Sequence, residues 1–395
     1  MTYRILDCCR LCEHPVLIPY LDLGEQPLAN GLLQTADEPF ERYPLALCYC
    51  ERCRLSQLSV VVEPKLMFTD YRWRSGISKS WQEHCKQLVK DLARMGNFDG
   101  ATIIDIGSND GTLLAEFDRR YVNVKTVGVD PSPIDAHLYK NVMIKGMWGQ
   151  SAAKTIRETE GPASIITATN VLAHIDDLHG FIQAVTYAMA DEGIFVVEVP
   201  SQASLLINLL FDTVYHEHLS YFGLVQLRWL LAKHGLWIVS VLPIDSQGGS
   251  LSVMAIKSDE KVIDPQFIDE IPIDKYHKFQ QYVDRHCKNF LNSLGRIRSS
   301  EYNVIGVGAS AKATVFLNYL GLTQEDLYCV YDDNELKQGL FIPGTGIQVR
   351  KTWEGFSKHD ALLLLSWNIA EELKAKFRGL GNPVIYRQGG KVVVE

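Results

Sequence analysis

Thr102-Ile-Ile-Asp-Ile-Gly-Ser-Asn-Asp-Gly111 is the stretch of sequence that decides the fold. Its β-branched residues predict a buried strand that runs into a glycine turn, and the pattern from residue 113 predicts a helix after the turn. Glycines at positions 107 and 111 let the backbone approach a ligand closely, while Asp105 can accept hydrogen bonds from an ammonium or hydroxyl group. A strand, a glycine turn and a helix in this order predict a parallel α/β sheet.

The same alternation of short strands and amphipathic segments continues as far as residue 258. It ends in two strands joined by Gln247-Gly-Gly-Ser250, which predict an antiparallel hairpin. A hairpin that closes a parallel sheet is typical of the class I methyltransferase variant of the doubly wound, Rossmann-like fold. The expected strands are Ala101–Ile106, Thr126–Val129, Ser164–Ala168, Ile194–Val199, Leu236–Leu242 and Leu251–Ile256, and the expected helices are Trp81–Arg94, Leu113–Arg119, Phe181–Ala190 and one from Leu224 that ends at Gly235.

The second strand of this sheet ends in Asp130, where an acid can hold both hydroxyls of a ribose. The site is therefore expected to bind a nucleoside ligand. Dinucleotide sites begin with a glycine where this turn has Asp105, and this difference favours S-adenosylmethionine (SAM) over NAD. The expected SAM-binding residues are Asp105, Gly107, Asn109, Gly111, Asp130 and Asn170, the last of which follows the next strand.

The segment Phe211-Asp-Thr-Val-Tyr-His-Glu-His-Leu-Ser-Tyr221 is too polar for a core strand and too aromatic for a solvated loop. Together with His174, at the carboxyl edge of the sheet, it predicts an active site. A metal site at His216 and His218 is poorly supported because no further ligand is obvious. Spacing alone does not separate the roles of these two histidines.

Six of the nine cysteines lie within the first 53 residues and include two CxxC pairs. Each pair can present two thiolates to one tetrahedral Zn²⁺. Four thiolates leave no open coordination position, so the expected zinc is structural. Cys8 and Cys48 are second-choice ligands, and the expected ligands are Cys9, Cys12, Cys50 and Cys53.

A second, smaller Rossmann-like unit is expected after a polar linker at residues 258–275. A long helix, Tyr276–Arg298, precedes a strand at Asn303–Gly306, a glycine turn and a helix that ends at Tyr319. Further strands are expected at Tyr328–Tyr331 and Ala361–Leu365. The expected domains are a zinc-binding module at 1–75, a SAM-dependent methyltransferase domain at 76–258 and this unit at 259–395.

The motifs resemble those of the sugar C-methyltransferase family along nearly the whole chain. They are the two CxxC pairs, Leu23-Gly-Glu-Gln-Pro-Leu-Ala-Asn30, Ile106-Gly-Ser-Asn-Asp-Gly111, Asn170-Val-Leu-Ala-His174, Asp212-Thr-Val-Tyr-His-Glu-His-Leu-Ser-Tyr221, Gly248-Gly-Ser-Leu251, Lys337-Gln-Gly and Pro343-Gly-Thr345. The resemblance implies nucleotide-linked 4-keto-deoxysugars as substrates, methylated at C-3, and implies that the unit at 259–395 binds the nucleotide sugar.

The resemblance also implies a role for particular residues. It makes His218 the catalytic base, with Tyr215, Glu217, His174 and Tyr71 lining the sugar site. A base of near-neutral pKa suits removal of a hydrogen from the carbon next to a ketone. The expected substrate contacts are Ser310, Lys312, Lys337 and Tyr221, with the two lysines facing a diphosphate; the alternative is that both lysines lie on the surface.

Several positions depart from the family pattern. Gln247 stands where the family usually has His, Ser252 where it has Arg, and Ser310 where it has Pro. The sequence Pro-Gly-Thr-Gly346-Ile-Gln348 replaces the usual Pro-Gly-Thr-His-Ile-Pro. These departures leave the sugar and its nucleotide open.

Composition and charge restrict the expected partners and location of the protein, while alternative activities remain open. The net charge of −8 argues against nucleic acid or an anionic membrane as a partner, and no apolar run or leader is evident, so a cytoplasmic protein is expected. A monomer is expected as well, although nothing in the sequence determines the oligomeric state. Methyl transfer to another carbon acid or a hydroxyl is one alternative activity, and a non-catalytic nucleoside-binding zinc protein is another. A nicotinamide dehydrogenase ranks lower because the GxGxxG spacing fails after Gly306.

Overall fold

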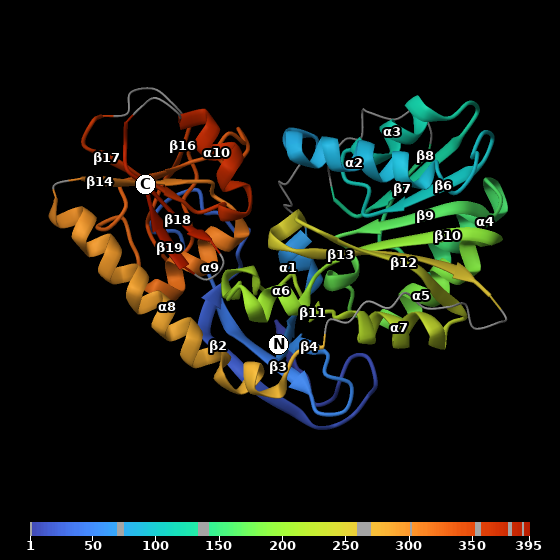
Figure 1. Cartoon of the computed structure of the whole chain (residues 1–395), viewed down its shortest axis with the longest axis horizontal. Helices are drawn as coiled ribbons and strands as arrows, with labels where there is room; N and C mark the ends of the chain where they lie inside the picture. The colour runs from blue at the N-terminus through green and yellow to red at the C-terminus, as the bar shows by residue number, and fades with distance from the viewer. Residues whose placement is uncertain are drawn as a thin grey trace.

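The computed structural model describes residues 2–68, 75–132, 142–258, 270–300, 302–351, 357–377, 381–388 and 391–395. Two Rossmann-like units lie side by side, and the N-terminal sheet lies below and between them in the view of Figure 1. No helix in these described ranges is long and apolar enough to cross a membrane.

The central sheet is the predicted doubly wound sheet, with strand order β12-β13-β10-β9-β6-β7-β8. Its strands are β6 (Thr102–Ile106), β7 (Lys125–Asp130), β8 (Val142–Lys145), β9 (Ala163–Thr169), β10 (Met189–Pro200), β12 (Leu236–Ile244) and β13 (Ser250–Lys257). β6 to β10 pair in parallel, whereas β13 is antiparallel to both β10 and β12. The predicted hairpin is therefore confirmed, and its second strand inserts between β10 and the first.

Helices cover both faces of this sheet (Figure 1), as the apolar residues on both faces of its strands require. They are α2 (Lys79–Leu92), α3 (Thr112–Arg120), α4 (Gln150–Thr159), α5 (Leu178–Ala188) and α7 (Leu224–Lys233), whereas α6 (Gln202–Ile207) packs on α8 (Ile273–Ser299). α2 packs on α3, and α5 packs on α4 and α7. Ser78 caps α2 by accepting a hydrogen bond from the backbone N–H of Trp81 at 3.2 Å, which fixes where the helix begins beside the glycine turn.

The N-terminal module forms strands that the sequence patterns did not indicate. A four-stranded antiparallel sheet has the order β11-β4-β3-β2, and β1 pairs with β5. The bounds are β1 (Tyr3–Ile5), β2 (Leu17–Pro27), β3 (Arg42–Cys50), β4 (Ser56–Leu58), β5 (Val60–Val62), α1 (Pro64–Phe68) and β11 (Ser220–Tyr221). β11 is the end of the His-Glu-His segment, so the proposed catalytic segment is a part of the N-terminal sheet.

The C-terminal unit is a second Rossmann-like sheet, with order β16-β15-β14-β17-β18-β19. Its elements are α8 (Ile273–Ser299), β14 (Asn303–Val307), α9 (Ala311–Leu320), β15 (Cys329–Tyr331), β16 (Val349–Arg350), β17 (Asp360–Leu364), α10 (Ala370–Phe377), β18 (Val384–Gln388) and β19 (Lys391–Val394). All strand pairs are parallel except β18 with β19. α8 and α9 both contact β2, so this unit is packed directly against the N-terminal sheet.

Candidate active site

The four predicted zinc ligands form one cluster. The Sγ atoms of Cys9, Cys12, Cys50 and Cys53 all lie within 4.8 Å of one another, and none of the nine cysteines is in a disulfide. Each CxxC pair forms a tight turn that ends in a residue of positive φ, Glu13 (58°) or Arg54 (63°).

The two turns are closed in the same way. The residue after each pair donates its N–H to the carbonyl of the first cysteine, at 2.9 Å from Glu13 to Cys9 and 3.0 Å from Arg54 to Cys50. Four thiolates in a compact cluster fit a tetrahedral, structural Zn²⁺. Cys8 and Cys48, the second-choice ligands, lie outside the cluster.

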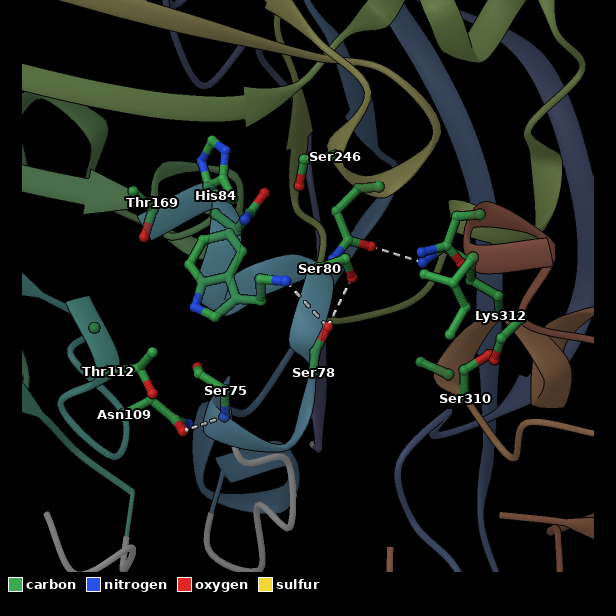
Figure 2. A pocket seen from close by; sticks show the side chains of 18 of the residues that line it. Ser75, Ser78, Ser80, His84, Asn109, Thr112, Thr169, Ser246, Ser310 and Lys312 are labelled. Atoms are coloured by element: carbon green, nitrogen blue, oxygen red, sulfur yellow. Dashed lines mark hydrogen bonds between the residues drawn. The ribbon is translucent and has the colours of Figure 1, made fainter. Parts of the chain in front are cut away.

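One cavity of about 1140 Å³ lies where the three parts of the chain meet. The N-terminal module contributes Asn30, the central sheet contributes the glycine turn, and the C-terminal unit contributes residues 308–312. The His-Glu-His segment, whose end pairs with the N-terminal sheet, contributes Tyr215, Glu217 and His218. Figure 2 shows Thr169 and His84 on one side of this cavity and Ser310 and Lys312 on the other. The volume exceeds what one drug-sized ligand usually needs, so it can hold two ligands side by side.

The glycine turn after β6 lines the end of this cavity where SAM is expected. Asp130 accepts a hydrogen bond from the backbone N–H of Asn109 at 2.8 Å and another from Ser132 at 2.7 Å. Asn109 in turn accepts from the N–H of Ser75 at 3.0 Å (Figure 2), which ties the turn to the segment before α2. These bonds fix the acid at the end of β7 in the position that a ribose-binding carboxylate needs.

Asp105 is buried beneath the same turn. Thr167 donates its hydroxyl to Asp105 at 2.7 Å, but burial dominates and raises the pKa of the carboxyl to about 7. A cationic ligand would favour the ionised form of this carboxyl. SAM carries such charge on its sulfonium and ammonium groups, so this residue fits the expected ligand.

Gly107 has no side chain, so it leaves space for Val171 beside the turn and lets a ligand approach the backbone. Its φ is +71°, and a Cβ built on it would lie 2.4 Å from the Cγ2 of Val171. Asn170 also has positive φ (58°), lines the cavity, and its buried Oδ1 has no hydrogen-bond partner among the described residues. The unpartnered oxygen of Asn170 fits a polar ligand in this turn.

Gly111 is placed differently from the other predicted SAM residues. It has φ +82°, caps the start of α3 and does not line the cavity. Its left-handed conformation lets the chain enter the helix, which is a reason for glycine that needs no ligand contact.

We expect Gly107→Ala to weaken SAM binding by at least about 10-fold, because the new methyl group displaces Val171 at the ligand turn. Gly100→Ala is the matched control, since Gly100 has the same φ of +71° but a Cβ added there would meet nothing within 4 Å. Both variants carry the same backbone strain, and only Gly107→Ala disturbs the turn. Calorimetric titration with SAM checks this; equal affinities in the two variants would contradict it.

His218 lies in the cavity wall with its two ring nitrogens in different environments. Nδ1 lies 3.0 Å from the carbonyl oxygen of Thr213, which can only accept, so Nδ1 carries the hydrogen. Nε2 is therefore the acceptor, and the hydroxyl of Tyr215 donates to it at 2.8 Å. Burial, followed by the nearby His174 and Lys312, holds the pKa of His218 well below its usual value. The ring is therefore neutral with a lone pair on Nε2, but it is a weaker base than the near-neutral one expected from the sequence.

The turn at residues 216–217 gives His216 and His218 different surroundings, which their spacing in the sequence could not predict. His218 lines the cavity, whereas His216 does not and packs edge-on against Tyr43 of the N-terminal module, with ring centroids 5.8 Å apart. Burial lowers the pKa of His216 to about 4.

Tyr221 is placed behind the cavity wall. It is fully buried, does not line the cavity, and donates its hydroxyl to the Thr213 carbonyl at 3.0 Å. Tyr221 is therefore not placed to contact a ligand in the cavity, contrary to the prediction. Its hydroxyl instead supports the Thr213 carbonyl, which also holds His218. Tyr71 lies outside the described residues.

Glu217 and His174, which are expected to line the sugar site, lie in this wall of the cavity. The Oε1 atom of Glu217 accepts a hydrogen bond from Asn30 at 3.0 Å, and burial raises the pKa of this carboxyl to about 7. The ring of His174 lies 4.8 Å from that of His218, centroid to centroid. Burial lowers the pKa of His174 to about 4, so both imidazoles are neutral.

The C-terminal unit places its two predicted lysines in the same cavity, not on the surface. Lys312 is buried and donates to the Oε1 of Gln247 at 2.7 Å (Figure 2). Burial lowers the pKa of Lys312 to about 8. Lys337 donates to the carbonyl of Ala309 at 2.8 Å, and Ser310 lines the cavity while capping α9.

Other residues of the site were missed from the sequence. Glu198, fully buried in β10, lies 2.7 Å from the Nε2 of His84, which lines the cavity. Burial lowers the pKa of His84, but the hydrogen bond to Glu198 and the charge of Glu198 together raise it more, so the net pKa is above the usual value. An acid inside an otherwise apolar predicted strand was the available signal, because a buried charge needs a partner.

The His-Glu-His segment is also fastened to the C-terminal unit through Asp212. Its carboxylate lies 2.8 Å from the Nη1 of Arg387 and accepts from the indole of Trp367 at 2.6 Å. Asp212 and Arg387 are buried, Trp367 is partly buried, and Arg387 stacks over Phe211 with its Cζ 4.7 Å from the ring centroid. Removing either partner of such a pair leaves a buried charge, so the segment and the C-terminal unit are coupled.

Two solved structures show low similarity to part of the chain. Magnesium protoporphyrin IX methyltransferase of Synechocystis PCC 6803, with bound SAM, has 14% identity and a TM-score of 0.34 over 45% of this chain and 79% of its own. A SAM-dependent methyltransferase from Anabaena variabilis has 16% identity and a TM-score of 0.35 over 44% and 84%. These scores are too low to support an inference about this chain.

Family models match the chain along its length. A putative zinc binding domain matches residues 9–68, a methyltransferase domain matches 79–241, and a C-methyltransferase C-terminal domain matches 245–395. The C-methyltransferase NovU of Streptomyces niveus is 31% identical over 389 residues, which cover 94% of this chain and 92% of NovU. With these matches in the order that its motifs predict, the chain belongs to the C-methyltransferase family and is a SAM-dependent C-methyltransferase with a structural zinc site.

Proposed function

We propose that this C-methyltransferase acts on a nucleotide-diphosphate 4-keto-deoxysugar and methylates C-3, the carbon next to the ketone. One observation carries the proposal: a single cavity is lined by His218 and by the glycine turns of two Rossmann-like units. One turn suits SAM, and the other suits the nucleotide of the substrate.

The second turn repeats the geometry of the first. Asp332, which follows β15, accepts hydrogen bonds from the backbone N–H of Ala309 at 2.8 Å and of Asn334 at 2.9 Å. Asp130 makes the same two kinds of contact at the end of β7. Both acids line the cavity, so it has two ends that are shaped for nucleosides.

Charge supports a diphosphate between the two ends. Lys312 and Lys337 lie in the cavity of a chain whose net charge is −8, so the cationic groups are supplied locally. The ammonium of Lys312 is buried with the neutral Gln247 as its hydrogen-bond acceptor, an arrangement that an anionic ligand would stabilise. Ser310, at the start of α9, lies in the same wall.

The residues around His218 support carbon chemistry. The Nε2 lone pair of this neutral imidazole can take the hydrogen next to the ketone, once substrate displaces the Tyr215 hydroxyl. The Thr213 carbonyl, which accepts from Nδ1, then stabilises the imidazolium. SAM supplies the electrophilic methyl group. The chain has to hold the nucleophilic carbon in line with it, which is a task of positioning.

Incubation with a 4-keto-6-deoxysugar nucleotide in D₂O tests the proposal. We expect deuterium next to the ketone when SAM is absent, and in H₂O with SAM we expect a product heavier by one methylene group. Methylation without any exchange of that hydrogen would favour a hydroxyl acceptor. Neither change with any keto-sugar nucleotide, while SAM still binds, would overturn the proposed substrate class.

A further inference from the structure

Asn30 brings the zinc-binding module into the cavity. It follows β2, lines the cavity, and donates its side-chain N–H to the Oε1 of Glu217 at 3.0 Å. The two residues are 187 positions apart in the chain. The contact therefore depends on the N-terminal sheet being folded against the catalytic segment.

The backbone on both sides of Asn30 is fixed by the C-terminal unit. The carbonyl of Ala29 accepts a hydrogen bond from the buried hydroxyl of Thr314 on α9 at 2.8 Å. Leu33 and Phe341 exchange two backbone hydrogen bonds of 2.9 Å each. Asn30 is thus held between two parts of the chain, and its amide has little freedom to leave Glu217.

The contact decides which oxygen of Glu217 faces a ligand. Glu217 is 2% exposed, and its Oε2 has no hydrogen-bond partner among the described residues. Because Oε1 accepts from Asn30 and a carbonyl oxygen is a better acceptor than a hydroxyl oxygen, this contact favours the neutral acid with its proton on Oε2. A buried carboxyl group with an unpartnered oxygen in a cavity wall is expected to meet a polar ligand atom there.

We propose that Asn30 is a positioning residue, which orients Glu217 so that its Oε2–H donates a hydrogen bond to the ketone oxygen of the substrate. The inference rests on the proposed function and adds an active role for the zinc-binding module. His218 takes the proton from the carbon next to the ketone, and the C–H electron pair becomes the new C=C bond. The carbonyl π pair moves to the oxygen, where the hydrogen bond from Glu217 stabilises the developing charge.

The protonation of Glu217 is consistent with this geometry. Burial raises the pKa of Glu217 to about 7, and the hydrogen bond from Asn30 opposes that rise. The other titratable groups around it are His174, Tyr215 and His218 in the cavity wall, Tyr221 behind the wall, and Lys312 across the cavity. Both histidines are neutral, so a substantial fraction of Glu217 can stay protonated at neutral pH.

Titration of Glu217 in the full-length protein tests the contact without any substrate. The probe is the ¹³C NMR signal of the side-chain carboxyl in ¹³C-glutamate-labelled protein, assigned by its loss in Glu217→Gln. In Asn30→Ala we expect its midpoint to rise by about one pH unit, because a hydrogen bond to the carboxylate is lost. Asn30→Asp, which keeps the shape, should raise it too, and Gln34→Ala, on an exposed side chain of the same segment, should not. An unchanged midpoint in both Asn30 variants overturns the inference.

A double-mutant cycle tests whether Asn30 acts through Glu217 in the reaction. We expect Asn30→Ala to lower kcat about 10- to 100-fold, with zinc content and SAM affinity unchanged, and to have no further effect in a Glu217→Gln background. Additive losses would mean a general structural role and would overturn the inference. If the wild-type enzyme turned over no keto-sugar nucleotide, the proposed function would fail, while the titration would still decide whether Asn30 controls Glu217.

Discussion

His218→Gln is expected to abolish both methyl transfer and hydrogen exchange next to the ketone, with kcat falling by about 10³-fold or more, while SAM binds as in the wild type. Glutamine keeps a polar side chain of similar length but has no basic nitrogen. In the wild type the Thr213 carbonyl holds the hydrogen on Nδ1, so the basic lone pair is on Nε2, in the cavity wall. The glycine turn that is expected to bind SAM belongs to other elements and should be unaffected.

His216→Gln is the matched control for this variant. The residue is two positions away and equally buried, but it packs against Tyr43 and does not line the cavity. We expect His216→Gln to retain activity and to lose up to about 3 kcal/mol of stability, as is usual for a substitution in a packed interface. Isotope exchange by mass spectrometry and thermal unfolding measure the two effects. Undiminished exchange in His218→Gln would sink the assignment of the base, and loss of exchange only in His216→Gln would reverse it.

Local sequence patterns predicted the strands and helices that are determined by neighbouring residues in the chain. The strand expected at Ala101–Ile106 is β6 (Thr102–Ile106), and the helix expected at Tyr276–Arg298 is α8 (Ile273–Ser299). Apolar periodicity and glycine turns fix such elements through nearby residues alone. The two CxxC pairs were equally readable, because four thiolates in that spacing have few other uses in a long chain.

The N-terminal strands could not be read in this way. β2 pairs with β3 across two register shifts, one after Pro19 and one after Asp22, and these irregularities break the alternation that identifies a strand. β11 is two residues long and forms only because it pairs with β4. Strands of this kind are defined by their partners more than by their own sequence.

Contacts between residues far apart in the sequence could not be predicted either, because they too depend on distant partners. Asn30 was part of a recognised motif, but nothing near it in the sequence indicates Glu217 as its partner. Asp212 likewise meets Arg387, which lies in the last described strand but one. A sequence pattern can show that a residue type has a purpose, whereas the side chain it meets depends on how three separate sheets pack.

Zinc removal is expected to have the largest effect on stability. Zn²⁺ bound by such ligand sets contributes about 10–16 kcal/mol to the folding of zinc-finger peptides near neutral pH. Cys50→Ser removes a ligand at the end of β3, so we expect loss of the metal and unfolding of the N-terminal sheet at a lower temperature than the rest of the chain. Metal analysis and calorimetric unfolding measure both effects.

Cys48→Ser is the matched control, because Cys48 is buried on the same strand two residues earlier but lies outside the cluster. This variant should keep its zinc and lose only about 1–3 kcal/mol, since a buried hydroxyl replaces a thiol. β11 and Asn30 connect the N-terminal sheet, which holds the zinc cluster, to the catalytic segment. Cys50→Ser should therefore lose exchange activity together with its metal. Full activity in a zinc-free protein would show that the catalytic segment holds its geometry without the N-terminal sheet, contrary to the packing of β11 on β4.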